Sequence, residues 1–256
     1  MSSLHATPKP ECDVDLEMDE VKPQVLCSTS RRENIVILLS YVLFAFAGKL
    51  IAEQFSDQDF SAVLTISAAV QCLGFLILLL KVRMQKTAAG ISSRTLEMFC
   101  VVFVFRLSST LVKNGYIPVD RSGDWVYQSA DILSLLMVMQ LLFSINITHR
   151  STYQHMLDTV EMWRAIPGCV LLAIFVHGDL NAHPFFDTLW TVSLNLDAIA
   201  LIPQLVMLYK TNGALRETEG LNAHYVFAIF CSRALSFWFW FHGFSEVAPQ
   251  KGGKNT

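Results

Sequence analysis

Seven long apolar stretches run through most of this 256-residue chain and decide what it can fold into. A helix needs about 20 mostly apolar residues to cross a hydrocarbon layer ~30 Å thick. Strands and loops cannot lie against lipid with their backbone groups unpaired. The stretches therefore predict an all-α polytopic membrane protein with about seven transmembrane helices. We place these spans at about 35–53, 61–81, 95–113, 125–146, 160–177, 186–209 and 224–244.

The polar segments between the stretches predict domain boundaries and orientation. Residues 1–34 lack the plan of a secretory signal and predict a disordered cytosolic tail; 35–244 form the transmembrane domain and 245–256 a short polar tail. Basic residues gather around alternate loops, whereas the opposite loops hold only Lys113 and Arg121. The positive-inside rule then places the N-terminus in the cytosol and the C-terminus on the lumenal or exterior side. The basic residues on the cytosolic side are Arg31, Arg32, Lys81, Arg83, Lys86, Arg94, Arg150, Lys210 and Arg216.

Two charged residues, Asp197 and Arg233, fall near the middle of the last two predicted spans. An ionised side chain at bilayer depth costs several kcal/mol, roughly 3 on insertion scales, unless it faces a polar interior or meets a partner. One interpretation is a structural ion pair that fixes the two helices together. The other gives both charges a functional role at the floor of a cavity.

Polar and aromatic side chains recur on one face of each of these spans. Asp187, Trp190 and Asp197 follow one another at helical spacing in the sixth span. Arg233 and Trp240 share a face of the seventh. These faces predict a cavity open to the lumen, with Asp187, Trp190 and Trp240 as ligand-binding residues. Tryptophans near a membrane edge also serve as packing or interface residues, and that alternative stays open.

Arg106, in the third span, is a further candidate ligand-binding residue. It has no acidic neighbour close to it on its own helix, so the carboxylate of a ligand is one candidate partner. A contact with a backbone carbonyl, or snorkelling to the lumenal surface, is the alternative. Asp131 lies in the first turns of the fourth span, also on the predicted lumenal side.

Motifs of catalysis and metal binding are absent from the sequence. It contains no HExxH or GxSxG motif, no catalytic carboxylate pair and no nucleotide-binding loop. Its six cysteines show no CxxC or metal-ligand spacing. We therefore expect no enzyme, and no metal, cofactor or nucleic-acid partner.

Several short motifs agree in order with one known family. They are AAGIS at 88–92, Arg106, LWTVSLNLDAIALIPQL at 189–205, KT at 210–211, HY at 224–225 and RAL at 233–235. Together they resemble the ER lumen protein-retaining receptors, or KDEL receptors, over about residues 61–242. The resemblance implies a SWEET-like bundle in ER and Golgi membranes. Its lumenal cavity would bind C-terminal HDEL- or KDEL-type peptides for Golgi-to-ER retrieval, with membrane lipids and a vesicle coat as further partners.

The resemblance also implies roles for individual residues. Arg106 matches the family arginine that holds the end of the ligand. Asp187 and Trp190 match a cavity glutamate and a cavity tryptophan. Asp197 and Arg233 match a buried pair of an acid and an arginine.

The chain also departs from the family pattern. Leu64 and Gln71 stand where the family has a ligand-contacting arginine and a pH-sensing histidine. An extra helix precedes the family's first, and its last helix has no counterpart. Because Gln71 cannot titrate near neutrality, the candidate pH sensors are the histidines toward the lumen. These are His177, His183 and His242.

Two other functions stay open from the residues alone. Pro203 and Gln204 interrupt the sixth span, as helix breaks do in transporters. A small-solute transporter of the SWEET or PQ-loop type is therefore one alternative, but it would need two comparable three-helix repeats, and the Pro-Gln pair occurs once. A pseudo-receptor that binds partners but no peptide is the other alternative.

Overall fold

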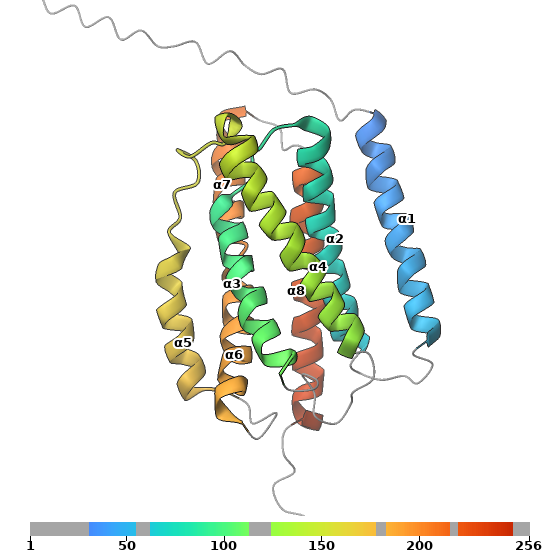
Figure 1. Cartoon of the computed structure of the whole chain (residues 1–256), viewed down its shortest axis with the longest axis vertical. Coiled ribbons are helices and arrows are strands. Elements are labelled where there is room, and N and C mark those ends of the chain that lie inside the picture. The colour runs from blue at the N-terminus through green and yellow to red at the C-terminus, as the bar shows by residue number, and fades with distance from the viewer. Residues whose placement is uncertain (1–30, 55–61, 113–123, 178–182, 216–219, 248–256) are drawn as a thin grey trace, which may run out of the picture.

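Helices account for nearly all of the structured chain. The computed structural model describes residues 31–54, 62–112, 124–177, 183–215 and 220–247, and no strand occurs among them (Figure 1). The all-α fold predicted from the apolar stretches is therefore confirmed. The α-helices are α1 (Arg31–Gln54), α2 (Ala62–Gln85), α3 (Ser93–Thr110), α4 (Asp124–Phe143), α5 (Ala165–Phe175), α6 (Pro184–Ile199), α7 (Ile202–Leu215) and α8 (Gly220–Val247), with short turns η1 (Ser144–Thr148), η2 (Arg150–Thr152) and η3 (Met162–Arg164).

The helix ends differ from the predicted boundaries in several places. Helix α1 begins at Arg31, inside the segment predicted to be a disordered tail, and α8 continues to Val247, past the predicted end of the transmembrane domain. The rest of both predicted tails lies outside the described residues. Helix α5 is shorter than the predicted span because a 3₁₀ turn, η3, replaces its first residues. Within the described residues, Val63–Gln85, Trp125–Thr148 and Pro184–Thr211 are long and apolar enough to span a membrane.

The predicted sixth span is divided into two helices. Helix α6 ends at Ile199 and α7 begins at Ile202. Pro203 lies in the first turn of α7, where its missing backbone N–H is tolerated but an unbroken helix across it is not. The break therefore lies just before the proline that predicted an interruption.

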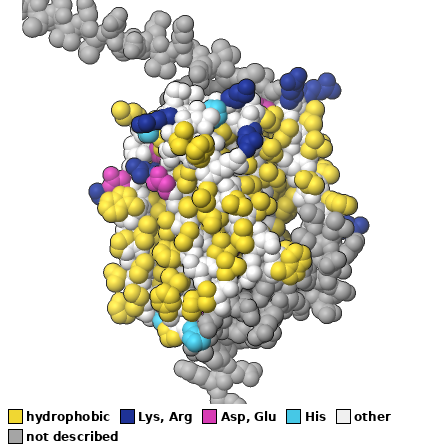
Figure 2. All heavy atoms as spheres, in the orientation of Figure 1, with side chains coloured by type: hydrophobic (Ala, Val, Ile, Leu, Met, Phe, Trp, Pro, Cys, Tyr) yellow, Lys and Arg dark blue, Asp and Glu magenta, His cyan; other side chains and the backbone are white. Residues whose placement is uncertain are grey.

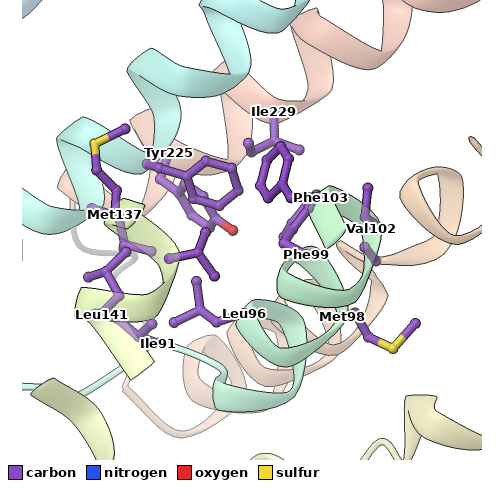
Figure 3. Packing of buried hydrophobic residues seen from close by; sticks show 14 of the residues in the cluster. Ile91, Leu96, Met98, Phe99, Val102, Phe103, Met137, Leu141, Tyr225 and Ile229 are labelled. Carbon is purple, nitrogen blue, oxygen red and sulfur yellow. The ribbon is translucent and has the colours of Figure 1, made fainter. Parts of the chain in front are cut away.

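The core forms where α2, α3, α4, α6 and α8 meet. Helix α2 packs against α8 and α4, α3 packs against α4 and α6, and α5 covers the outer side of α6. Figure 3 shows Phe99 and Phe103 of α3 beside Tyr225 of α8, with Leu141 of α4 facing them. The Phe75 ring meets the Phe99 ring edge-on at a centroid distance of 5.0 Å. Phe75 also contacts the rings of Phe103 and Tyr225, so this aromatic packing joins α2, α3 and α8.

Helix α1 lies at the edge of the bundle beside α2 (Figure 1). Ile37 packs on α2 and α8 through a small apolar cluster. Two polar contacts help hold the helix: Tyr41 Oη lies 3.2 Å from His224 Nδ1, and Gln85 Nε2 donates to Glu33 Oε1 at 2.9 Å. The sequence predicts this helix as an addition in front of the family pattern, and that stays a prediction.

Apolar and basic side chains lie on different parts of the molecular surface. Figure 2 shows hydrophobic side chains over the side of the bundle, and Lys and Arg gathered mainly at the end where α1 begins and α2 ends. Arg31, Arg32, Arg83 and Lys86 are exposed at that end. The orientation with this end in the cytosol stays a prediction.

The loop between α2 and α3 is tied to three helices at the same end. Gly90 adopts a left-handed conformation, with φ of 73°. Its carbonyl accepts from Gln204 Nε2 at 2.8 Å and from Asn222 Nδ2 at 3.2 Å. Lys81 Nζ, fully buried, donates to the Ala89 carbonyl at 2.8 Å. Gln204, beside the helix break, therefore links α7 to this loop by a hydrogen bond.

We expect Gly90→Ala to lower the free energy of unfolding by about 1–2 kcal/mol, because a residue with a Cβ is strained at positive φ. The new Cβ would also lie 2.6 Å from Asn222 Nδ2. Thermal melting of purified protein measures the effect. Gly168→Ala in α5 is the matched control, since its Cβ meets nothing within 4 Å. An unchanged melting temperature for Gly90→Ala would show that the loop is not held as described.

Candidate functional site

A cluster of buried polar side chains joins five helices at the centre of the bundle. Asp197 of α6 is its hub, with 1% of its surface exposed. Its Oδ2 accepts from the guanidinium groups of both Arg106 on α3 and Arg233 on α8. Its Oδ1 accepts from Gln71 Nε2 of α2 at 3.3 Å. The structure thus brings Asp197 and Arg233 into an ion pair and adds Arg106 to it.

Arg106 has acidic partners that its own helix does not supply. Besides Asp197, its Nη1 donates to Asp131 Oδ1 of α4 at 3.3 Å and to Gln71 Oε1 at 3.5 Å. Only 3% of its surface is exposed, so the snorkelling alternative is wrong. The sequence placed both Asp131 and Arg106 on the lumenal side but gave no signal that they meet. Their contact depends on how α3 packs against α4.

A small cavity lies against this cluster. Its polar wall includes Gln71, Arg106, Asp197 and Arg233. Its apolar wall includes Leu64, Ala68 and Leu194, and Tyr127 and Trp190 also line it. Sequence reasoning missed Tyr127, whose only signal is its position one helical turn before Asp131.

Several buried polar atoms around the cavity make no hydrogen bond. Three are donors on side chains that line it: Nε of Arg106, Nε of Arg233 and Nε1 of Trp190. Asp131 Oδ2 is a buried acceptor that also lacks a hydrogen-bond partner. Buried polar groups are normally paired, so a lining with spare donors favours a ligand rich in acceptors. A carboxylate, which only accepts, is such a group.

Comparison with known proteins identifies the family. The family model for ER lumen protein retaining receptors matches residues 87–243. The chain belongs to this family. It is 31% identical to ER lumen protein-retaining receptor B of Arabidopsis thaliana over 65% of this chain and 72% of that protein. It is also 31% identical to the receptor erd-2.2 of Caenorhabditis elegans, over 66% and 73%, and 27% identical to the Drosophila melanogaster receptor, over 62% and 68%.

Membership makes this chain a membrane protein of the ER and Golgi system. Most of the cluster lies within the matched family region, including both arginines and both aspartates. Gln71 and Leu64, on α2, precede that region. The cluster therefore combines residues inside the matched region with a residue of α2 that lies outside it.

Trp190 and Trp240 are close neighbours beside the cavity. Their rings meet edge to face with centroids 5.3 Å apart. Trp190 lines the cavity, whereas Trp240 packs against Trp190 in a cluster that includes Phe239. Both indole N–H groups lack a partner. The ligand-binding role predicted for these tryptophans stays a prediction.

Asp187 lies apart from the other predicted site residues. It sits in the first turn of α6, ten residues before Asp197, or about 15 Å along the helix axis. It is 1% exposed and does not line the cavity. Its predicted ligand contact therefore requires a peptide that extends beyond the cavity along α6.

None of the three candidate pH sensors lines the cavity. His177 follows α5 and bonds to the Ala173 carbonyl at 3.1 Å. His183 caps the start of α6, and the His242 ring packs on Trp238 with centroids 4.0 Å apart. Their pH-sensing role stays a prediction, and it would require that protonation of a histidine outside the lining affect the cavity.

Proposed function

We propose that this protein binds C-terminal HDEL- or KDEL-type signals of lumenal proteins and returns them from the Golgi to the ER. The observation that carries this proposal is the lining of the cavity. Two guanidinium groups and an indole each keep a buried, unpaired N–H donor there. The free carboxylate at the end of a peptide matches such donors better than an internal peptide segment, which has no terminal charge.

The apolar wall supports the same ligand. Leu64, Ala68 and Leu194 stand beside the arginines in one cavity. Both signals end in leucine, so its carboxylate can face Arg106 while its side chain contacts the apolar wall. The preceding acidic residues of the signal would extend toward the lumen.

The relatives' names support retention rather than transport or catalysis. Those reported above are all called ER lumen protein-retaining receptors. A small-solute transporter is not favoured, although α6 and α7 are separated by a break. The partners proposed are lumenal peptides, the surrounding lipid and, for the return journey, a vesicle coat.

Retrieval can be tested in cells deprived of their own retention receptors. Expressing this chain should restore retention of a lumenal reporter that ends in HDEL. A reporter with two glycines added after the leucine should still be secreted, because its carboxylate no longer follows the leucine. Equal secretion of both reporters, with the protein folded in ER and Golgi membranes, would contradict the proposed function.

A further inference from the structure

Asp131 contacts the candidate carboxylate-binding arginine from behind the cavity wall. It lies on α4, 1% exposed, and does not line the cavity. Its Oδ1 accepts from Arg106 Nη1 at 3.3 Å, and this is an ion pair between two buried groups. Its Oδ2 has no hydrogen-bond partner. Asp131 is therefore an acid held in the bundle mainly by the arginine that it faces.

Both terminal nitrogens of Arg106 already donate hydrogen bonds to carboxylates of the protein. Nη1 donates to Asp131 and Nη2 to Asp197, which leaves only Nε without a partner. The ion-paired cluster contains two arginines, Arg106 and Arg233, and two aspartates. Its formal charges cancel. A peptide carboxylate entering this cavity would add a negative charge to a neutral, buried cluster, which is unfavourable.

The two aspartates differ in how firmly they are held. Asp197 accepts from Arg106, Arg233 and Gln71, so it joins three other helices to α6. Asp131 accepts from Arg106 alone among the hydrogen bonds described. Removing the charge of Asp131 would therefore disturb the bundle less than removing that of Asp197. It would also leave the cluster with one net positive charge for a ligand to neutralise.

We propose that Asp131 is an internal competitor for Arg106 that sets the affinity of the site for a terminal carboxylate. This inference rests on the proposed function, because it concerns the same ligand and the same arginine. A peptide carboxylate takes up hydrogen bonds and charge that Asp131 otherwise occupies. The wild-type site therefore binds its ligand less tightly than its two arginines alone would allow, which favours release after retrieval.

The test compares Asp131→Asn with the wild type by titrating purified protein with HDEL peptide. Asparagine keeps the size of the side chain and an oxygen that accepts from Arg106, but it removes the charge. Binding of the free peptide should tighten roughly tenfold, because removing one negative charge close to Arg106 weakens the repulsion of the peptide carboxylate. A peptide with an amidated C-terminus should gain nothing. A general loosening of the bundle would instead change the binding of the free and the amidated peptide alike.

A matched control is Glu97→Gln, which removes one negative charge from α3 itself. Glu97 is exposed and pairs with Arg94 about two and a half turns from Arg106. Its substitution should leave peptide affinity unchanged. If Asp131→Asn is not recovered folded, Asp131→Ser removes the same charge and should tighten binding in the same way.

The outcomes separate this inference from the proposed function. Saturable binding to the wild type, with equal or weaker binding to the neutral variant, would overturn the competitor role and leave the receptor function standing. Weaker binding in particular would mean that Asp131 only orients Arg106. No binding by the wild type or by either folded neutral variant would instead overturn the proposed function, and with it this inference.

Discussion

Arg106→Ala is expected to lower the affinity for peptides with a free C-terminal carboxylate at least about a hundredfold. The substitution removes charge-assisted hydrogen bonds, each worth about 1.5–3 kcal/mol. It also leaves Asp131 and Asp197 with only one arginine between them, so the cluster gains a net negative charge that repels the ligand. Isothermal titration of purified protein with HDEL peptide measures the loss.

Two further variants make this result specific. Arg106→Lys keeps the charge but loses the planar fork that grips two acceptors at once, so it should recover only part of the affinity. Arg94→Ala, at the partly exposed start of α3, should bind like the wild type. If folded Arg106→Ala bound the free peptide as tightly as the wild type, Arg106 would not be the carboxylate-binding residue.

The second large effect concerns the hub of the cluster. Asp197→Ala leaves the buried Arg106 and the partly buried Arg233 with only Asp131 to balance them. Breaking a buried ion pair by removing one partner costs about 3–5 kcal/mol, so the yield of folded protein and its melting temperature should both fall sharply. Arg233→Ala should do less, because the Arg233 side chain is 21% exposed and Asp197 keeps Arg106.

The double variant distinguishes an ion pair from two independent losses. In Asp197→Ala with Arg233→Ala, Arg106 and Asp131 remain and their charges cancel. The double variant should therefore be more stable than Asp197→Ala alone. Fluorescence-detected size-exclusion chromatography after heating ranks the three variants. A double variant no better than the worse single one would show that the two residues are not coupled.

The sequence predicted the features that the membrane itself imposes. The helices lie close to the predicted spans because only an apolar helix satisfies its backbone in lipid. Asp197 and Arg233 were predicted as partners because each is costly alone at bilayer depth, and the structure brings them into contact. The break between α6 and α7 follows from Pro203, whose ring and missing N–H act locally.

Features that depend on packing between helices could not be predicted in the same way. Helical spacing placed Asp187, Trp190 and Asp197 on one face, but it did not show that Asp187 lies beyond the cavity. The contact between Asp131 and Arg106 depends on how α4 crosses α3, which no pattern along either helix encodes. The same holds for Tyr127, whose place on the cavity wall is set by the neighbours of α4.

The most direct test of the receptor account is a titration of the purified, folded protein with two peptides that differ only at the C-terminus. One ends in HDEL with a free carboxylate and the other is amidated, and both are measured at Golgi-like and ER-like pH. We predict saturable binding of the free peptide and no measurable binding of the amidated one. No saturable binding of the free peptide at either pH, or equal binding of both peptides, would contradict the account.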